Sequence, residues 1–287
     1  MTDDKRKISC IALDLDGTAL RDDKRISRQT RRAIEDAVRA GISVVIASGR
    51  AFRSLPESAV LIEGIRYAVT SNGAAVYRME DGACIRRVLL EGEAVEGILR
   101  VTEGMALGME AFQNGVPYAQ REYIEDPVRF GAMPYAVSYI QSTREPVSNI
   151  REFVRRNWRE LDGIDLIVAD EEKRKNLWSR LKNSSFPLYV TSSVRNRIEI
   201  TSRRAGKAGG LKFLQELLDI PKEETAAFGD ADNDIDMLEA AGISIAMENA
   251  SPGCKDAADY ITKSNREDGV AFAIRHILGI PESRTAE

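Results

Sequence analysis

The sequence predicts an α/β fold in which a parallel β-sheet is covered by helices and interrupted by a second, smaller α+β domain. Three observations lead to this expectation. Apolar runs alternate with helical segments at both ends of the chain, the middle follows another pattern, and acidic or small polar residues follow several of the runs. Near-continuous apolar strands separated by helices are typical of a parallel sheet buried on both faces.

Residues 1–78 are expected to form the first part of this sheet. Its three apolar runs span residues 8–13, 42–47 and 67–70. Ser27 can cap a helix that lies between the first two runs, and Gly41 is typical of a helix end. A short helix interrupted by Pro56 is expected before the third run.

Residues 202–287 repeat the alternation and are expected to complete the sheet. Strands are predicted at 225–228 and 243–247, and helices at 207–218, from Asp232 or Asn233 onward, and from Glu267 onward. His276, the single histidine, lies late in the last helix, where a basic side chain suits the helix dipole. Histidine-based catalysis is therefore not expected, and carboxylates must perform any acid–base chemistry.

Residues 79–201 mix helical and strand-like segments without a parallel-sheet pattern. Helices are predicted at 92–103, 149–161 and 171–181, and strands at 85–89, 135–140, 188–191 and 197–201. We therefore expect an α+β domain inserted into the interrupted α/β domain. Linkers near Arg78 and Thr201 would join the two domains.

Composition narrows the function classes. The 287-residue chain is 43% hydrophobic and 30% charged, which is typical of a globular protein. Its net charge of −4 argues against nucleic acid as a partner. We expect neither a membrane span nor a secretory leader, and the three widely spaced cysteines match no disulfide or zinc pattern. A cytoplasmic location is the default expectation.

The most informative motif is Asp-Leu-Asp-Gly-Thr at residues 14–18, directly after the first apolar run. Open α/β sheets bind ligands beyond the carboxyl ends of their strands, and residues two apart in a strand face the same side. Asp14 could therefore attack a substrate while Asp16 moves protons, since carboxylates are known nucleophiles. Asp and Gly are also ordinary turn residues, so this motif alone is a moderate signal.

Further polar segments follow other predicted strands or open helices. They are Ser48-Gly49-Arg50, Ser71-Asn72-Gly73-Ala74, Lys207 after Gly206, and Gly229-Asp230-Ala231-Asp232-Asn233-Asp234. Hydroxyl and backbone N–H groups at strand-to-helix junctions can hold phosphate oxygens. The acidic segment suits Mg²⁺, which prefers carboxylate oxygens, phosphate and water. Each segment alone is also compatible with a turn or a solvated helix end.

Together these segments resemble the motifs of the haloacid dehalogenase-like superfamily. Residues 14–18 are similar to its first motif, Ser48 to the second, Lys207 to the third, and residues 229–234 to the fourth. The resemblance implies a Rossmann-like core at 1–78 and 202–287, with a large C2-type cap at 79–201.

A narrower resemblance points to the Cof-type branch of the superfamily. It rests on Gly49-Arg50, on Ala-Met-Glu-Asn-Ala at 246–250 and on Glu-Asp-Gly-Val at 267–270. There are two departures from the common pattern. Ser48 stands where Thr is also found and keeps the hydroxyl, and Ala208 follows the lysine where Gly is frequent.

The resemblance also implies roles for the site residues. Asp14 would form an aspartyl-phosphate, and Asp16 would protonate the leaving oxygen and then activate water. Ser48, Gly49, Lys207, Asn72 and Asn233 would bind the phosphoryl group or order its site. Mg²⁺ would be held by Asp14, the main-chain carbonyl of Asp16, Asp230 and Asp234. Whether Asp234 would contact the metal directly or through water stays open.

Phosphatase is the preferred activity. A dehalogenase would not need an acid two residues after its nucleophile, yet Asp16 is present. A phosphonate hydrolase of this superfamily would need a Schiff-base lysine and usually lacks the second Asp. A phosphoryl mutase remains an alternative, because it shares this core. A binding protein that has lost the chemistry is the alternative from another class.

The substrate is expected to be a small phosphorylated metabolite, because a large cap excludes bulky macromolecules and water. Sugar phosphates are the first class to consider on resemblance. Arg121, Arg129 and Arg144 are cap cations that could meet a polar substrate, although surface charges are the simpler interpretation. The sequence does not specify an oligomeric state.

Overall fold

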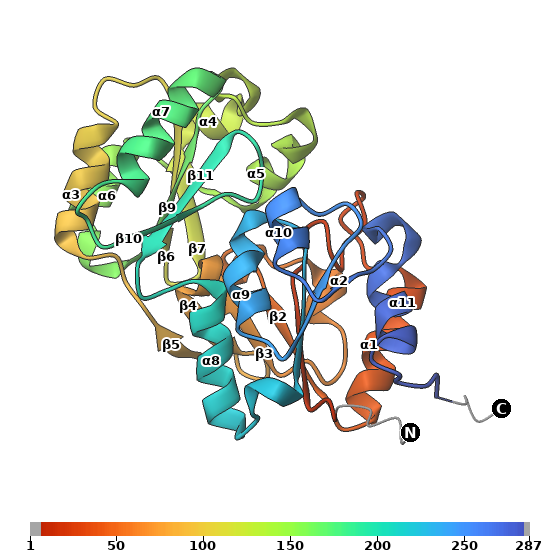
Figure 1. The fold of residues 1–287 in the computed structure, drawn as a ribbon. Helices are drawn as coiled ribbons and strands as arrows, with labels where there is room; N and C mark the ends of the chain where they lie inside the picture. Colours follow the sequence, from red (N-terminus) through yellow and green to blue (C-terminus); the bar gives the residue numbers. More distant parts are fainter. Residues whose placement is uncertain (1–6, 284–287) are drawn as a thin grey trace.

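The computed structural model describes residues 7–283, and these residues form two β-sheets, each with its own helices (Figure 1). The larger sheet has eight strands and the smaller has six. The α/β fold with a parallel sheet is therefore confirmed. No helix within 7–283 is long and apolar enough to cross a membrane.

The larger sheet has the strand order β14-β13-β12-β1-β2-β3-β4-β5. Its strands are β1 (Cys10–Leu13), β2 (Ser43–Ala47), β3 (Tyr67–Thr70), β4 (Ala75–Arg78), β5 (Cys84–Arg87), β12 (Thr225–Gly229), β13 (Ile243–Ala246) and β14 (Tyr260–Ile261). All neighbours from β14 to β3 pair in parallel, and β4 and β5 add antiparallel pairs. Leu13 lies in register with Phe228 on one side and Ile46 on the other, so these three strands end at one level.

Helices cover both faces of the larger sheet (Figure 1). They are α1 (Arg28–Arg39), α2 (Glu57–Val60), α8 (Lys207–Leu218), α9 (Ile235–Glu239), α10 (Pro252–Asp256) and α11 (Gly269–His276). Helix α1 begins as the sequence predicts, because the Ser27 hydroxyl accepts a hydrogen bond from the Thr30 amide. The apolar runs of the strands are fully buried between the two helical layers.

The smaller sheet has the order β10-β11-β9-β6-β7-β8. Its strands are β6 (Gly108–Gln113), β7 (Val116–Gln120), β8 (Glu145–Val147), β9 (Leu161–Ile167), β10 (Leu188–Thr191) and β11 (Arg197–Ser202). Its helices are α3 (Gly92–Val101), α4 (Arg121–Glu125), α5 (Val137–Thr143), α6 (Ile150–Arg156) and α7 (Glu171–Lys182). Helices α3, α6 and α7 bury the apolar face of this sheet, including Ile164 and Leu166 of β9.

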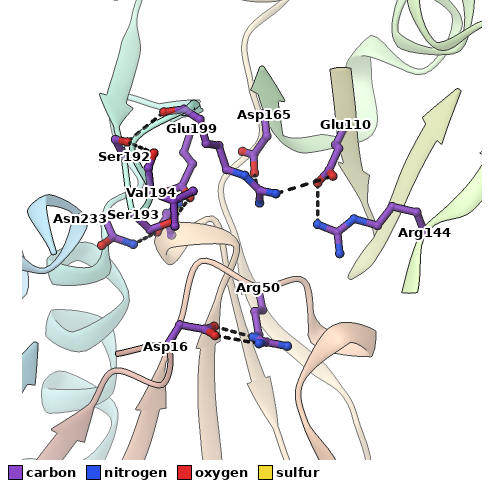
Figure 2. Close-up of polar contacts among 12 residues, drawn as sticks. Asp16, Arg50, Glu110, Arg144, Asp165, Ser192, Ser193, Val194, Glu199 and Asn233 are labelled. Carbon is purple, nitrogen blue, oxygen red and sulfur yellow. Dashed lines mark hydrogen bonds and ion pairs between the residues drawn. The ribbon is translucent and has the colours of Figure 1, made fainter. Parts of the chain in front are cut away.

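The opposite face of the smaller sheet is polar and is turned toward the larger domain (Figure 2). Side chains alternate between the two faces of a strand, so charged residues can flank apolar ones without entering the core. Glu110, Asp165 and Glu199 lie in register on the three adjacent strands β6, β9 and β11. Each is at most 5% exposed, so this face places three carboxyl groups away from water.

Strand β5 departs from the sequence-based expectation. It lies inside residues 79–201, yet it pairs with β4 and joins the larger sheet. A tight connection containing Gly82, which has φ +68°, turns the chain back on itself and makes β4 and β5 an antiparallel hairpin. Residues 79–201 therefore contribute one strand to the sheet that they were expected only to interrupt, and the smaller domain begins beyond β5.

The middle of the chain also differs in its elements. Residues 135–140, predicted as a strand, form a short helical turn and the start of α5, because Pro134 is well placed to open a helix. Strands β6, β7 and β9 were not predicted. In β6 and β9 the apolar residues are interrupted by Glu110 and Asp165, and a charge inside a short window weakens a strand signal.

Gly73 offers a test of how tightly the strand ends are packed. It has φ +83°, and a Cβ atom there would lie 1.8 Å from the Gly206 carbonyl oxygen. Gly41 has φ +85° with open space around it. We expect Gly41→Ala to lose about 1–2 kcal/mol of unfolding free energy from the left-handed backbone alone. Gly73→Ala should lose about 1–3 kcal/mol more through overpacking.

Urea unfolding of both variants beside the wild-type protein measures the two losses. Equal losses would mean that the backbone around Gly206 relaxes freely, contrary to the packing described.

Candidate functional site

The predicted site residues lie at the carboxyl edge of the larger sheet. Asp14 follows β1, Ser48 follows β2, and Asp230 follows β12, and these three strands are neighbours. All three residues line a cavity of about 610 Å³. The smaller domain supplies the opposite wall, including Tyr139 and Arg197. The sheet geometry thus brings together side chains that are far apart in the sequence.

Asp14 is a buried carboxyl group with one unused oxygen. Its Oδ1 accepts a hydrogen bond of 2.7 Å from Nζ of Lys207. Its Oδ2 is buried and no residue within 7–283 donates to it. Burial raises the pKa of Asp14 to about 7, although the charge of Lys207 opposes this rise. The free oxygen therefore faces a site where an electrophile or a cation could satisfy it.

Lys207 connects two of the predicted site segments. Its fully buried ammonium group donates to Asp14 and, at 2.6 Å, to Oδ1 of Asp234. Burial lowers the pKa of Lys207, but the two carboxylates more than offset this effect and hold it above the ordinary value. The lysine opens α8, as predicted, and the anions that compensate its charge are protein carboxylates.

Asp16 lines the cavity and is held by two cations, of which Figure 2 shows Arg50. Nε and one terminal nitrogen of Arg50 donate to its two oxygens at 2.6 and 2.8 Å. Lys24 adds a third hydrogen bond of 3.0 Å. Burial would raise the pKa of Asp16, but the hydrogen bonds and charge of Arg50, together with Lys24, hold it below its usual range. The carboxyl group is therefore ionised in this arrangement.

Asp230 and Asp234 are fixed by the turn that follows β12. Oδ1 of Asp230 accepts a hydrogen bond of 3.0 Å from the Thr18 hydroxyl, and this bond links the turn to the first motif. Oδ2 of Asp234 accepts from the backbone N–H groups of Asp230 and Ala231, each at 3.0 Å. Gly17 leaves room for this contact, since a Cβ atom there would lie 2.2 Å from Asp230.

These carboxylates fit a divalent cation. Oxygen atoms of Asp14, Asp230 and Asp234 lie within 4.8 Å of one another. Burial, and then the charges of Asp14 and Asp234, hold the pKa of Asp230 well above its ordinary value. Together with the unused oxygen of Asp14, this donor set matches the hard oxygen ligands of Mg²⁺. The side chain of Asp16 is turned instead toward Arg50.

The predicted phosphate-binding residues divide into two groups. Ser48, Gly49 and Asn233 line the cavity. Lys207 and Asn72 do not line it, and their polar atoms are bound by other side chains. Asn72 donates to Glu199 and accepts from Asn233, both at 3.0 Å. Its side chain therefore links protein groups in this arrangement and is not turned toward a phosphate.

Sequence reasoning did not identify the polar wall of the smaller domain. Arg144 donates to Glu110 at 2.7 Å, and Arg197 donates to Asp165 at 3.2 Å (Figure 2). Burial raises the pKa of Asp165 well above its ordinary value, whereas Arg144 and Arg197 overcome the same burial effect at Glu110 and lower its pKa. The sequence did hold one signal of this wall: in each of β6, β9 and β11, an acidic residue stands among apolar neighbours.

The three cap arginines considered from the sequence differ in their surroundings. Arg144 is 5% exposed and lines the cavity, so it is not a surface charge. Its guanidinium also stacks on Tyr139 at 4.4 Å. Arg121 and Arg129 are exposed and lie outside the cavity lining. Only Arg144 of the three is therefore placed to influence a ligand in the cavity.

Comparisons with known proteins agree with this geometry. The family model described as haloacid dehalogenase-like hydrolase matches residues 11–274. Phosphatase YwpJ of Bacillus subtilis (strain 168) is 32% identical over 93% of this chain and 99% of its own. The 5-amino-6-(5-phospho-D-ribitylamino)uracil phosphatase YcsE of the same strain is 31% identical over 94% of this chain and 95% of its own.

Solved structures show the same similarity. A haloacid dehalogenase-like hydrolase from B. subtilis superposes with a TM-score of 0.83 at 32% identity, covering 94% of this chain and all of that one. A haloacid dehalogenase-like hydrolase from Bacteroides thetaiotaomicron has a TM-score of 0.76 at 27% identity, with 94% and 100% covered. The likeness therefore extends across both sheets.

Lys207 should be essential for the stability of the site. Lys207→Met leaves the buried carboxylates of Asp14 and Asp234 without their cation, which should cost about 3–5 kcal/mol of unfolding free energy. Lys212→Met, on the exposed face of the same helix, is the matched control and should cost little. Urea unfolding at neutral pH with a metal chelator present measures both. Equal stability of the two variants would contradict the ion-pair arrangement.

Proposed function

The chain belongs to the haloacid dehalogenase-like hydrolases and is a phosphatase, and we propose that it hydrolyses small phosphorylated metabolites with Mg²⁺ through an aspartyl-phosphate on Asp14. The observation that carries the proposal is the placement of Asp14. It is a buried carboxyl group with one unpartnered oxygen, at the wall of a cavity and beside two other carboxylates. A nucleophile and a cation site therefore coincide at one strand end.

The first step requires a nucleophile that is oriented and ionised. The Lys207 ammonium group holds Oδ1 of Asp14, so the opposite oxygen, Oδ2, is the one available for attack on phosphorus. Asp14 titrates near neutrality in the surroundings described, and a bound cation would favour its ionised form. Positioning and charge stabilisation carry most of the catalysis of phosphoryl transfer.

Asp16 would act on protons in both half-reactions. In the arrangement described it is ionised, which suits the activation of water in the second step. To protonate a leaving oxygen in the first step, it must first exchange its contact with Arg50 for the substrate and take up a proton from solvent. Lys24 contacts the same carboxyl group from an exposed position, so this cation can move away without unfolding the site.

Asp14 and Asp230 are the side chains that would hold Mg²⁺, with the main-chain carbonyl of Asp16. Mg²⁺ would neutralise the charge that develops on the transferred phosphoryl group. Asp234 uses Oδ1 for Lys207 and Oδ2 for two backbone N–H groups. These contacts favour an indirect role, in which Asp234 orients the turn that carries Asp230. Ser48, Gly49 and Asn233 line the cavity where phosphoryl oxygens would lie.

The cavity supports a small substrate with a polar leaving group. Residues 79–201, apart from β5, would act as the cap over the core 1–78 and 202–287. Arg144, Arg197 and Glu199 face the cavity from this side and can hydrogen-bond hydroxyl groups. Sugar phosphates are therefore the first substrates to test. The phosphorylated ribitylaminouracil on which YcsE acts is the second, because that relative matches nearly the whole chain.

Two alternatives stay testable beside the phosphatase. A phosphoryl mutase would share Asp14 and Asp16 but would protect its phosphoenzyme from water. A binding protein on this fold would keep the cavity without turnover. Release of inorganic phosphate from a panel of sugar phosphates, nucleotides and phosphorylated cofactors distinguishes the phosphatase from both alternatives, since neither of them releases phosphate rapidly.

Asp14→Asn should abolish turnover without unfolding the protein. The amide oxygen can still accept from Lys207, but an amide is a poor nucleophile, so kcat on p-nitrophenyl phosphate should fall by roughly 10³-fold or more. Asp22→Asn is the matched control, because Asp22 is an exposed aspartate at the same cavity. A folded Asp14→Asn variant with wild-type turnover would show that another group attacks phosphorus.

Asp230→Asn should weaken metal dependence. Activity of the wild-type protein should disappear with a chelator and return with Mg²⁺. In the variant, the Mg²⁺ concentration for half-maximal activity should rise tenfold or more, because one charged ligand is lost. Asp232→Asn, two residues away and exposed, should behave as wild type. Full activity of the wild-type protein after metal removal would end the metal hypothesis.

A further inference from the structure

We propose that Glu199 is a positioning residue for the phosphatase reaction, acting through Asn72 on the amide of Asn233. This inference rests on the proposed function. Glu199 belongs to β11 of the smaller sheet, whereas Asn72 and Asn233 follow strands of the larger sheet. The contact therefore couples the two domains at a point beside the catalytic carboxylates.

The three side chains form an unbroken series of hydrogen bonds. Asn233 Nδ2 donates to Asn72 Oδ1 at 3.0 Å, and Asn72 Nδ2 donates to Glu199 Oε2 at 3.0 Å. The other oxygen of Glu199 accepts from the Ser193 hydroxyl, in the loop before β11 (Figure 2). Glu199, Asn72 and Asn233 are each 3% exposed, so these contacts are largely shielded from bulk water.

The carboxylate of Glu199 fixes which group donates in each hydrogen bond of the series. Both oxygens of Glu199 accept, so Asn72 must turn its NH₂ group toward Glu199 and its carbonyl toward Asn233. Asn233 must then turn its own NH₂ group toward Asn72. One carboxylate in the smaller domain thereby selects one of two amide orientations at Asn233, whose side chain lines the cavity.

The backbone at Asn72 is held in an unusual conformation to make this contact. Ser71, Asn72 and Gly73 have successive φ values of 48°, 50° and 83°. Left-handed non-glycine residues cost of order 1–3 kcal/mol each and persist where the surroundings fix them. Here the Gly206 amide donates to the Asn72 carbonyl at 2.9 Å, and the Asn72 amide donates to the Ser48 carbonyl at 3.2 Å.

Gly49 completes the support around Asn72. A Cβ atom at Gly49 would lie 3.1 Å from the Asn72 side-chain oxygen, which is closer than ordinary contact. The absence of a side chain there leaves room for the amide. Three segments of the phosphate site, those around Ser48, Gly206 and Asn233, therefore converge on Asn72.

The consequence for the reaction lies at Asn233. It precedes Asp234, which binds Lys207 and the backbone of Asp230. A wrongly turned Asn233 amide would present the wrong polar group to a phosphoryl oxygen. Glu199 also lines the cavity and so has a second conceivable role, direct contact with the leaving group. The two roles differ in whether the effect passes through Asn233.

A double-mutant cycle on p-nitrophenyl phosphate tests this inference. Glu199→Met and Asn233→Ala are made singly and together in the full chain, and kcat/KM is measured with Mg²⁺. The kcat/KM of each single variant should fall about tenfold or more. The kcat/KM of the double variant should be no lower than that of the less active single variant, because the effects of coupled residues are non-additive. Multiplying losses would overturn the proposal, as would an unchanged Glu199→Met rate.

Conservative and distant variants complete the design. Glu199→Gln keeps an acceptor for Asn72 and should recover part of the loss seen with Glu199→Met. Glu145→Met, at an exposed position of β8, is the control and should match wild type. If Glu199→Met does not give the wild-type circular dichroism spectrum, Asn72→Ala replaces it in the same cycle, with the same non-additivity expected.

The outcomes separate this inference from the proposed function. A wild-type protein that releases no phosphate from p-nitrophenyl phosphate or the metabolite panel refutes the proposed function itself. An active wild type with an additive cycle refutes only the role of Glu199. A Glu199→Met defect confined to larger substrates would assign Glu199 to the leaving group and would also overturn the proposal.

Discussion

The buried contact of Lys207 with Asp14 and Asp234 is the constraint on which the rest of the site depends. Two carboxylates in a protein interior would be costly without a cation, and one lysine satisfies both. It also fixes which oxygen of Asp14 remains free. Because Asp234 in turn holds the backbone at Asp230, the lysine connects the first, third and fourth motifs in one electrostatic unit. The negative charge that remains at this strand edge fits a divalent cation.

Sheet geometry explains why distant residues meet here. Parallel strands β1, β2 and β12 end at one level, so the residues that follow them share one edge of the sheet. The smaller sheet forms the opposite wall of the cavity with its polar face, whereas its other face packs into an apolar core. That face carries Glu110, Asp165 and Glu199 in register, partly neutralised by arginines. An apolar layer thus packs against the helices of the smaller domain, and a polar layer lines the cavity.

The parts of this fold that could be predicted are those in which the local pattern of apolar residues matches the burial of the segment. The strands of the larger sheet are buried on both faces, so 8–13 and 42–47 are continuous apolar runs. Strands β6 and β9 were missed because one face is charged, and the arginines that compensate those charges are far away in the sequence. Asp14, Ser48 and Asp230 were predicted because strand ends define the site. The contacts of Arg50 with Asp16 and of Asn72 with Glu199 join residues 34 and 127 positions apart, and no local pattern reveals them.

The environment of Asp16 ties acid–base chemistry to the position of the smaller domain. Arg50 is bound to Asp16 on one side and stacks on Tyr139 of α5 at 4.2 Å on the other. Arg144 stacks on the same ring, so Tyr139 joins a guanidinium of the core to one of the smaller domain. A movement of α5 would therefore change the cation–π contact that helps to hold Arg50, and with it the charge that keeps Asp16 ionised. Under the proposed function, Asp16 would have to exchange this contact for substrate before it could carry a proton to a leaving group, so its protonation would depend on the position of α5.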